Sequence, residues 1–254
     1  MNWLLLRGLA REQRHWGEFK SKLHDLPFVD EVLCLDLPGF GEAVDEESPL
    51  TIEEITDNLR EKFLDKAEEN DTWGICAISL GGMIAMDWLS RFPKDFEVAK
   101  LMNTSSANYS APWKRFKGYN FIHPGLLRET DFSIHDIEKM ILATISNRYA
   151  HSEAVLNEWV KIRESCPYDP LDVAKQLAAG AIFYAQPERI HQPVLLLCSA
   201  QDRLVDTSCT LNLAKDFKNA YINIHPTGGH EISLDEPDWV CEKMASRFGT
   251  KTVD

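Results

Sequence analysis

The chain has 254 residues, 44% of them hydrophobic and 26% charged, and its formal net charge is −13 at pH 7. This length fits one α/β domain with room for an inserted subdomain, and the hydrophobic fraction is ordinary for a globular enzyme. The acidic excess argues against nucleic acid or an anionic membrane as the main partner, and no apolar run approaches the ~20 residues that span a bilayer.

The first predicted element is a short buried strand at residues 3–6. It follows no basic segment and is too short for a signal peptide, so we expect a cytoplasmic protein. The six cysteines include no CxxC pair and no Cys/His cluster, so we expect no zinc site, and no motif implies another metal or a cofactor.

Strands and helices alternate along most of the chain. Apolar runs predict further buried strands at residues 32–35, 73–78, 98–102, 194–197 and 221–224. Helical periodicity appears between them at residues 16–23, 51–66, 80–91, 206–215 and 238–248. This alternation predicts an α/β fold with a mostly parallel sheet, helices on both faces, and a ligand site beyond the carboxyl ends of the strands.

Residues 111–187 interrupt the alternation. They contain helical patterns at residues 134–146 and 153–164 but no convincing strand. We expect a helical cap here, inserted into a core formed by residues 1–110 and 188–254. A cap that closes over the site builds much of the substrate pocket. Its aromatic residues Trp113, Phe116 and Tyr119 either line an acyl pocket or form the core of the cap itself.

A serine follows the third predicted strand directly and precedes a helix. Ser79 stands between Ala77 and Gly81, and small residues at these positions let neighbouring backbone pass closely. A serine on such a strained turn presents its hydroxyl above the carboxyl end of the sheet. The spacing therefore predicts a nucleophile for acyl transfer at Ser79.

A serine nucleophile needs a histidine as base and an acid that orients the histidine. Asp202 follows a buried strand and is the predicted acid, while Asp206 is better placed to cap the next helix. His230 follows two glycines after the last strand and is the predicted base. His225 is expected to be only a strand-end residue.

An oxyanion hole would complete this site, at roughly 2.7–4 kcal/mol per donor in a well-studied protease. We expect one donor to be the backbone N–H of Leu80, directly after the nucleophile. The N–H of Leu9, in the loop that Gly8 opens after the first strand, is the candidate for the second donor.

Taken in order, these motifs resemble those of the α/β-hydrolase superfamily over nearly the whole chain outside the cap. The matching segments are LLLRG at residues 4–8, DLPGFG at 36–41, AISLG at 77–81, LCSAQD at 197–202 and GGH at 228–230. The resemblance implies the α/β-hydrolase fold with an inserted cap and a Ser-His-Asp triad of Ser79, His230 and Asp202.

Two positions depart from the family pattern. Ala77 replaces the usual glycine and is still small enough for the turn. Arg7 stands where the family usually has histidine before Gly8. Arg7 either replaces that histidine in ordering the oxyanion loop, or sits near the pocket floor and binds a substrate carboxylate.

Within the superfamily, the short chain and helical cap look most like small bacterial carboxylesterases. One of these removes the methyl group from pimeloyl-acyl carrier protein in biotin synthesis. Lys114, Arg115 and Lys117 could dock such an acidic carrier, or form an ordinary solvated basic patch. The expected substrate is thus a small ester or a carrier-linked acyl group, and the protein a monomer or a dimer.

The same triad serves other functions in this fold. Acyltransferases and carbon–carbon bond hydrolases use it, and hormone receptors of this fold keep it with slow turnover. Turnover of short acyl esters would separate an enzyme from a receptor. The resemblance favours a serine carboxylic ester hydrolase.

Overall fold

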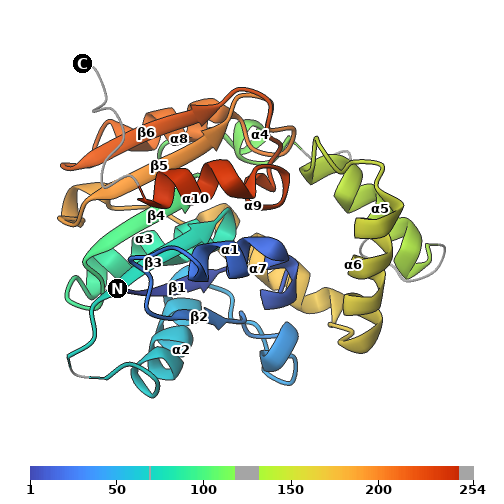
Figure 1. Ribbon diagram of the computed structural model, residues 1–254, viewed down its shortest axis with the longest axis horizontal. Coiled ribbons are helices and arrows are strands. Elements are labelled where there is room, and N and C mark those ends of the chain that lie inside the picture. The colour runs from blue at the N-terminus through green and yellow to red at the C-terminus, as the bar shows by residue number, and fades with distance from the viewer. Residues whose placement is uncertain (69, 118–131, 246–254) are drawn as a thin grey trace.

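The computed structural model describes residues 1–68, 70–117 and 132–245 (Figure 1). Six parallel strands form one sheet in the order β2-β1-β3-β4-β5-β6, which confirms the predicted parallel α/β architecture. The strands are β1 (Asn2–Leu6), β2 (Val32–Leu35), β3 (Trp73–Ile78), β4 (Val98–Met102), β5 (Val194–Ser199) and β6 (Ala220–His225). Each predicted strand is present and differs at its ends by at most two residues.

Helices cover both faces of the sheet (Figure 1). On one face lie α1 (Glu18–His24) and α10 (Pro237–Ala245), and on the other α2 (Ile52–Leu64), α3 (Leu80–Arg91) and α8 (Thr207–Ala214). Successive side chains of β1 point to opposite faces of the sheet, so that Leu4 packs with α2 and α3 while Leu5 packs with α1 and α10. The strands are therefore mostly apolar on both faces, with exceptions such as Lys100 in β4 and Asn223 in β6.

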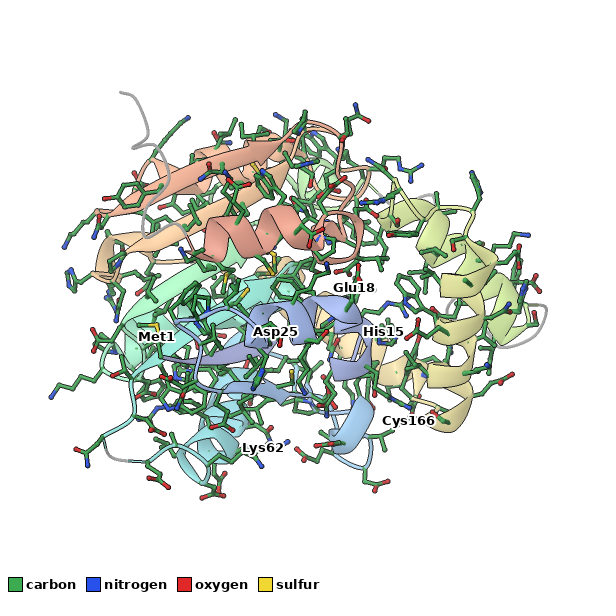
Figure 2. All side chains as sticks on the ribbon, viewed as in Figure 1. Met1, His15, Glu18, Asp25, Lys62 and Cys166 are labelled. Carbon is green, nitrogen blue, oxygen red and sulfur yellow. The ribbon has the colours of Figure 1, made fainter. Side chains whose placement is uncertain are left out.

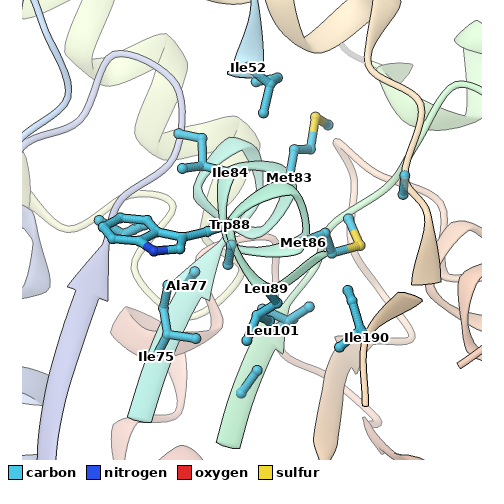
Figure 3. Close-up of a cluster of buried hydrophobic side chains, with 14 of the residues drawn as sticks. Ile52, Ile75, Ala77, Met83, Ile84, Met86, Trp88, Leu89, Leu101 and Ile190 are labelled. Carbon is cyan, nitrogen blue, oxygen red and sulfur yellow. The ribbon is translucent and has the colours of Figure 1, made fainter. Parts of the chain in front are cut away.

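Helix α3 is buried on nearly all sides (Figure 3). Ile84, Met86 and Leu89 pack over β3 and β4 and are fully buried. At the start of the helix, a side chain on Gly81 would come within 2.5 Å of the carbonyl oxygen of Arg7, so only glycine allows this approach to the end of β1. The close contact fixes the residue before α3, Ser79, directly above the sheet.

The chain between β4 and β5 contributes only helices among its described residues. They are α4 (Pro112–Arg115), α5 (Ile134–Ile145), α6 (Glu153–Ser165), α7 (Pro170–Ile182) and the short η4 (Pro187–Arg189). Helices α5 and α6 lie beyond the carboxyl ends of the strands, apart from the two helical layers (Figure 1). They share a small apolar core that contains Leu142, Leu156 and Trp159. The cap limits at residues 111 and 187 stay a prediction.

Three short elements complete the described structure: η1 (Gln13–Trp16), η2 (Gly41–Ala43) and α9 (Ile232–Asp235). The predicted helix at residues 238–248 corresponds to α10, and its last three residues lie outside the described ranges. In the described part of the chain, no helix is long and apolar enough to cross a membrane.

Candidate active site

A cavity of about 140 Å³ lies where the carboxyl ends of the strands meet the cap. Its walls come from the loops after β1 and β5, from the β3–α3 turn, from the segment after β6 and from the cap. The core contributes Gly8, Leu9, Ala10, Arg11, Ile78, Ser79, Leu204, His230 and Glu231, and the segment between β4 and β5 contributes Phe116, Met140, Ile141, Thr144, Ile145, Tyr168, Val173 and Leu177. The cavity is thus mostly apolar, and its charged and catalytic candidates, Arg11, Ser79, His230 and Glu231, all lie on the core side.

Ser79 occupies a strained turn between β3 and α3. Its φ of 56° lies in the left-handed region, which costs a non-glycine residue of order 1–3 kcal/mol. Two hydrogen bonds to the backbone of Ser79 hold this conformation, since Ser79 N donates to the Met102 carbonyl at 2.9 Å and the Thr104 hydroxyl donates to the Ser79 carbonyl at 2.8 Å. The turn thus places the Ser79 side chain at the cavity wall.

Asp202 and His230 form a buried pair, although 28 residues separate them. His230 Nδ1 lies 2.7 Å from Asp202 Oδ2. The other carboxylate oxygen of Asp202 accepts the backbone N–H groups of Leu204 and Val205 at 2.7 and 2.9 Å, which fixes the carboxylate. With Nδ1 bonded to Asp202, Nε2 is the nitrogen available to Ser79, which lines the same cavity.

The charge of Asp202 controls the protonation of His230. Burial alone would lower the pKa of His230, but the negative charge of Asp202 and its hydrogen bond outweigh burial, so that the pKa is raised. A histidine with such a partner can hold a proton taken from a serine hydroxyl. The pair can therefore act as a general base and then as a general acid.

Asp206 and His225, the alternatives to Asp202 and His230, have structural roles. Asp206 caps α8 by accepting the N–H of Ser208 at 3.0 Å, as its position in the sequence predicts. His225 accepts the N–H of Gly228 at 2.9 Å and packs against Trp239. Neither residue lines the cavity.

Two buried side chains hold the segment that carries His230. Asn103 Nδ2 donates to the His230 carbonyl at 2.7 Å. Asp235 Oδ2 accepts the N–H groups of Gly229 at 2.7 Å and of Asn147 at 2.8 Å. Asn147 is the second residue after the end of α5. One carboxylate therefore ties the histidine segment to the cap.

Arg7 binds a carboxylate that belongs to the protein itself. Its guanidinium donates to Glu231 at 2.9 and 2.6 Å and lies over the ring of Trp16, 4.4 Å from the ring centroid. Both charged side chains are buried, and Arg7 does not line the cavity. The geometry favours the interpretation in which Arg7 orders the loops around the site over the one in which it binds substrate.

The predicted oxyanion donors lie on both sides of the nucleophile. Leu80 is the first residue of α3 and follows Ser79 directly. Leu9 lines the cavity, and a side chain on the neighbouring Gly8 would meet the Ser79 Cβ at 3.1 Å, so the loop after β1 passes close to the serine. Their assignment as donors stays a prediction.

The aromatic residues predicted for the pocket have different positions. Phe116 lines the cavity. Trp113 is 66% exposed and does not line it, so its predicted place in the pocket is not what the structure shows. Tyr119 lies outside the described residues.

Lys114, Arg115 and Lys117 do not form a shared surface patch. Arg115 is buried and donates to the carbonyl groups of Gly180 and Ala181 in α7. Lys117 donates to the Asp202 carbonyl, while exposed Lys114 contacts the Ser208 hydroxyl. Lys114 is the most exposed of the three, because Arg115 ties the start of the cap to α7 and Lys117 ties it to the core.

Sequence reasoning missed Glu231, Asn103, Asp235 and Arg11 as residues of the site. Asn103 directly follows a predicted strand and Glu231 directly follows His230, and these positions were their only local signal. Arg11, two residues after Leu9, and Asp235, five residues after His230, carried no local signal. Among the described residues, no group of His, Cys, Asp and Glu side chains gathers in a way that could hold a metal ion.

Comparison with known proteins supports the fold over nearly the whole chain. The profile of the Alpha/beta hydrolase family matches residues 3–243. A hydrolase from Pseudomonas aeruginosa PA01 has a TM-score of 0.78 at 19% identity, covering 96% of this chain and 88% of that chain. The enol-lactonase from Burkholderia xenovorans LB400 has a TM-score of 0.76 at 18% identity, covering 96% and 89%. At these identities the likeness shows the fold.

One curated protein matches over a short segment. The "Putative carbamate hydrolase RutD" of Caulobacter sp. (strain K31) is 43% identical over 51 residues, which is 20% of this chain and 19% of that protein. The chain thus matches about a fifth of the length of this curated relative.

Proposed function

We propose that this protein, which belongs to the alpha/beta hydrolase family, hydrolyses a carboxylic ester or thioester through an acyl-enzyme formed on Ser79. The observation that carries the proposal is that a serine, a histidine and an aspartate come together at one cavity. Ser79, held at a φ of 56°, lines the same cavity as His230, and His230 is bonded to the fixed carboxylate of Asp202.

The proposed reaction has two halves. In the first, Ser79 Oγ attacks the ester carbonyl carbon while His230 Nε2 takes the hydroxyl proton. The bond to the leaving oxygen or sulfur then breaks, and His230 returns the proton to the alcohol or thiol. In the second half, His230 takes a proton from water, the hydroxide attacks the acyl-enzyme, and Ser79 leaves with that proton.

Asp202 stabilises the imidazolium that forms in each half. The backbone N–H groups of Leu80 and Leu9 would receive the negative charge on the carbonyl oxygen. The chain's own residues thus supply the nucleophile, the base and the charge stabilisation.

Ester hydrolysis is favoured over transfer to another acceptor or carbon–carbon cleavage, because those reactions need a second substrate site or a polar enol site. The mostly apolar walls, such as Met140, Ile141 and Leu177, suit an acyl chain. A carrier-linked methyl ester receives less support than a small ester, since Arg115 is buried.

The test is hydrolysis of p-nitrophenyl esters from acetate to palmitate by the wild type and by Ser79→Ala in parallel. We expect turnover with the wild type, best for short acyl chains, and a loss of several orders of magnitude in Ser79→Ala. Equal rates for both proteins would exclude Ser79 as the nucleophile. Labelling of Ser79 by a fluorophosphonate without turnover of these esters would indicate either an enzyme selective for other esters or a low-turnover receptor.

A further inference from the structure

Arg11 lies in the loop after β1, only two residues beyond Leu9, and lines the cavity. Its side chain is 4% exposed. One terminal nitrogen, Nη1, donates to Glu138 at 2.8 Å and contacts His15 Nε2 at 3.1 Å. The other, Nη2, is buried and has no hydrogen-bond partner among the described residues. A buried guanidinium N–H without an acceptor is costly, so such a group calls for an explanation.

The charges around Arg11 do not balance. Glu138 is fully buried and faces both Arg11 and Arg163, whose Nη1 lies 3.4 Å away. His15 adds no negative charge and is itself neutral, because burial and the positive charges of Arg11 and Arg7 lower its pKa well below the ordinary value. Two guanidinium groups therefore share one carboxylate, and one positive charge stays uncompensated beside the cavity.

Packing fixes Arg11 in this position. Its guanidinium lies over the ring of Trp159 in α6, 4.6 Å from the ring centroid, and the ring of His15 meets the same tryptophan edge-on. Figure 2 shows His15 on the side of the core that faces α6. The Nη2 group is thus held at a set place rather than free to find another acceptor.

A second unpaired donor belongs to the same region. Gln176 of α7 is fully buried, and its Oε1 accepts the N–H of Ala10, a cavity residue, at 3.3 Å. Its Nε2 has no hydrogen-bond partner among the described residues. The loop after β1 therefore has two unsatisfied donors close to it.

We infer that the cavity takes an ester whose acyl chain ends in a carboxylate, and that this carboxylate binds Arg11 through Nη2. A carboxylate supplies the missing negative charge and is the acceptor that best matches a guanidinium. The inference rests on the proposed function, because it assigns the acyl part of the ester to this cavity. It makes Arg11 a specificity-determining residue.

The size of the cavity limits the acyl chain. A volume of about 140 Å³ is close to the ~150 Å³ cavity that holds benzene in an engineered protein. Ser79, Leu9 and Arg11 all line this cavity, so one short molecule within it can present its carbonyl to the first two and its carboxylate to Arg11. Half-esters of short dicarboxylic acids, with a chain of about six heavy atoms, fit these limits.

The experiment compares matched esters. The acidic substrates are p-nitrophenyl hydrogen glutarate and adipate, and the neutral ones of equal length are p-nitrophenyl valerate and hexanoate, all corrected for spontaneous hydrolysis. We expect the ratio of kcat/KM for acidic over neutral esters to fall at least tenfold in Arg11→Gln. Glu138 keeps Arg163 as its partner in this variant, so the cluster becomes neutral rather than acidic.

Arg163→Gln is the matched control, because it removes one positive charge from the same cluster at a residue that does not line the cavity. Its ratio should change much less. An unchanged ratio in Arg11→Gln, or equal losses in both variants, would overturn the inference. If Arg11→Gln does not fold, Arg11→Lys keeps a charge near Glu138 but lacks Nη2, and its ratio should also fall.

A binding measurement on a variant that cannot turn over tests the carboxylate site separately from the proposed ester hydrolysis. Monomethyl adipate should raise the melting temperature of Ser79→Ala more than methyl hexanoate does, and this difference should vanish when Arg11→Gln is added. That result would support the carboxylate site even if no ester were hydrolysed. Equal shifts with both compounds would contradict the site even if Ser79-dependent hydrolysis were found.

Discussion

The guanidinium of Arg7 and the carboxylate of Glu231, 224 positions apart in the chain, form a buried ion pair with two hydrogen bonds. Arg7 follows β1, and Glu231 directly follows His230. Burial would raise the pKa of Glu231, but the charge and the hydrogen bonds of Arg7 hold it below the ordinary value. The pair thus joins the predicted oxyanion loop to the histidine segment.

Removing one partner of this pair should destabilise the protein strongly. Glu231→Gln leaves the Arg7 charge buried without a counter-charge, and such changes cost about 3–5 kcal/mol in free energy of unfolding. Urea unfolding of the wild type and the variant at pH 7 measures the difference.

The double variant Arg7→Gln/Glu231→Gln is the control, since it removes both charges and leaves two amides that can bond each other. It should lose less stability than Glu231→Gln alone. A double variant less stable than the single one would mean that the two side chains act separately rather than as a pair.

The activity should rise with pH as His230 loses its proton, because only the neutral imidazole can act as a base. The pKa of His230 is raised, so the midpoint of the kcat/KM profile should lie above pH ~6.5. The same shift stabilises the fold fully below the unfolded pKa of ~6.5, and this contribution is lost as the pH rises through the folded pKa. A midpoint below pH 6 would contradict this assignment.

Asp202→Asn should move that midpoint to lower pH and reduce kcat by about 10⁴, as the equivalent change does in a serine protease. The asparagine removes the negative charge that raises the pKa of His230. Asp206→Asn is the matched control at a helix cap, and it should leave the profile in place. Equal effects of the two changes would make Asp206 a member of the site.

Local signals in the sequence were enough to predict the sheet and the residues at its ends. Ser79 follows β3 directly, Asp202 lies three residues after the end of β5 and His230 five residues after the end of β6. Parallel strands bring their carboxyl ends to one edge of the sheet. The small residues on either side of Ser79 predict the tight turn there, and the two glycines before His230 predict a tight segment.

Partners far apart in the sequence left no comparable signal. Arg7 and Glu231 meet only because the segment after β6 reaches back to the end of β1, although β3, β4 and β5 lie between these two strands in the sheet. Arg11 meets Glu138 only where α5 covers the core. The basic residues at 114–117 predicted an exposed patch, but Arg115 is buried against α7. This burial depends on tertiary packing, which the local sequence does not show.

Gly229 should tolerate no side chain, whereas its neighbour Gly228 should tolerate alanine better. A Cβ on Gly229 would come within 2.6 Å of the Ile145 carbonyl oxygen, while one on Gly228 would meet nothing closer than 3.2 Å, at His225. Gly229→Ala should therefore shift the histidine segment and lower kcat at least tenfold, with Gly228→Ala as the matched control. Equal kcat values in the two folded variants would contradict this.

Asp235 should couple the cap to the catalytic histidine. Its carboxylate accepts the N–H groups of Gly229 and Asn147 and the hydroxyl of Ser146, so it joins the residue before His230 to the segment after α5. In Asp235→Asn the amide nitrogen must face one of these donors, and a buried donor left unpaired costs about 1–3 kcal/mol.

The expected result is a fall in kcat at the optimum pH together with a lower melting temperature. Ser146→Ala removes a single hydroxyl donor from the same carboxylate and leaves both backbone bonds, so it should lower kcat less. A purely structural role would lower the melting temperature of Asp235→Asn while leaving kcat at low temperature unchanged. A fall in kcat that persists well below the melting transition is therefore what identifies Asp235 as a residue that positions His230 from the cap.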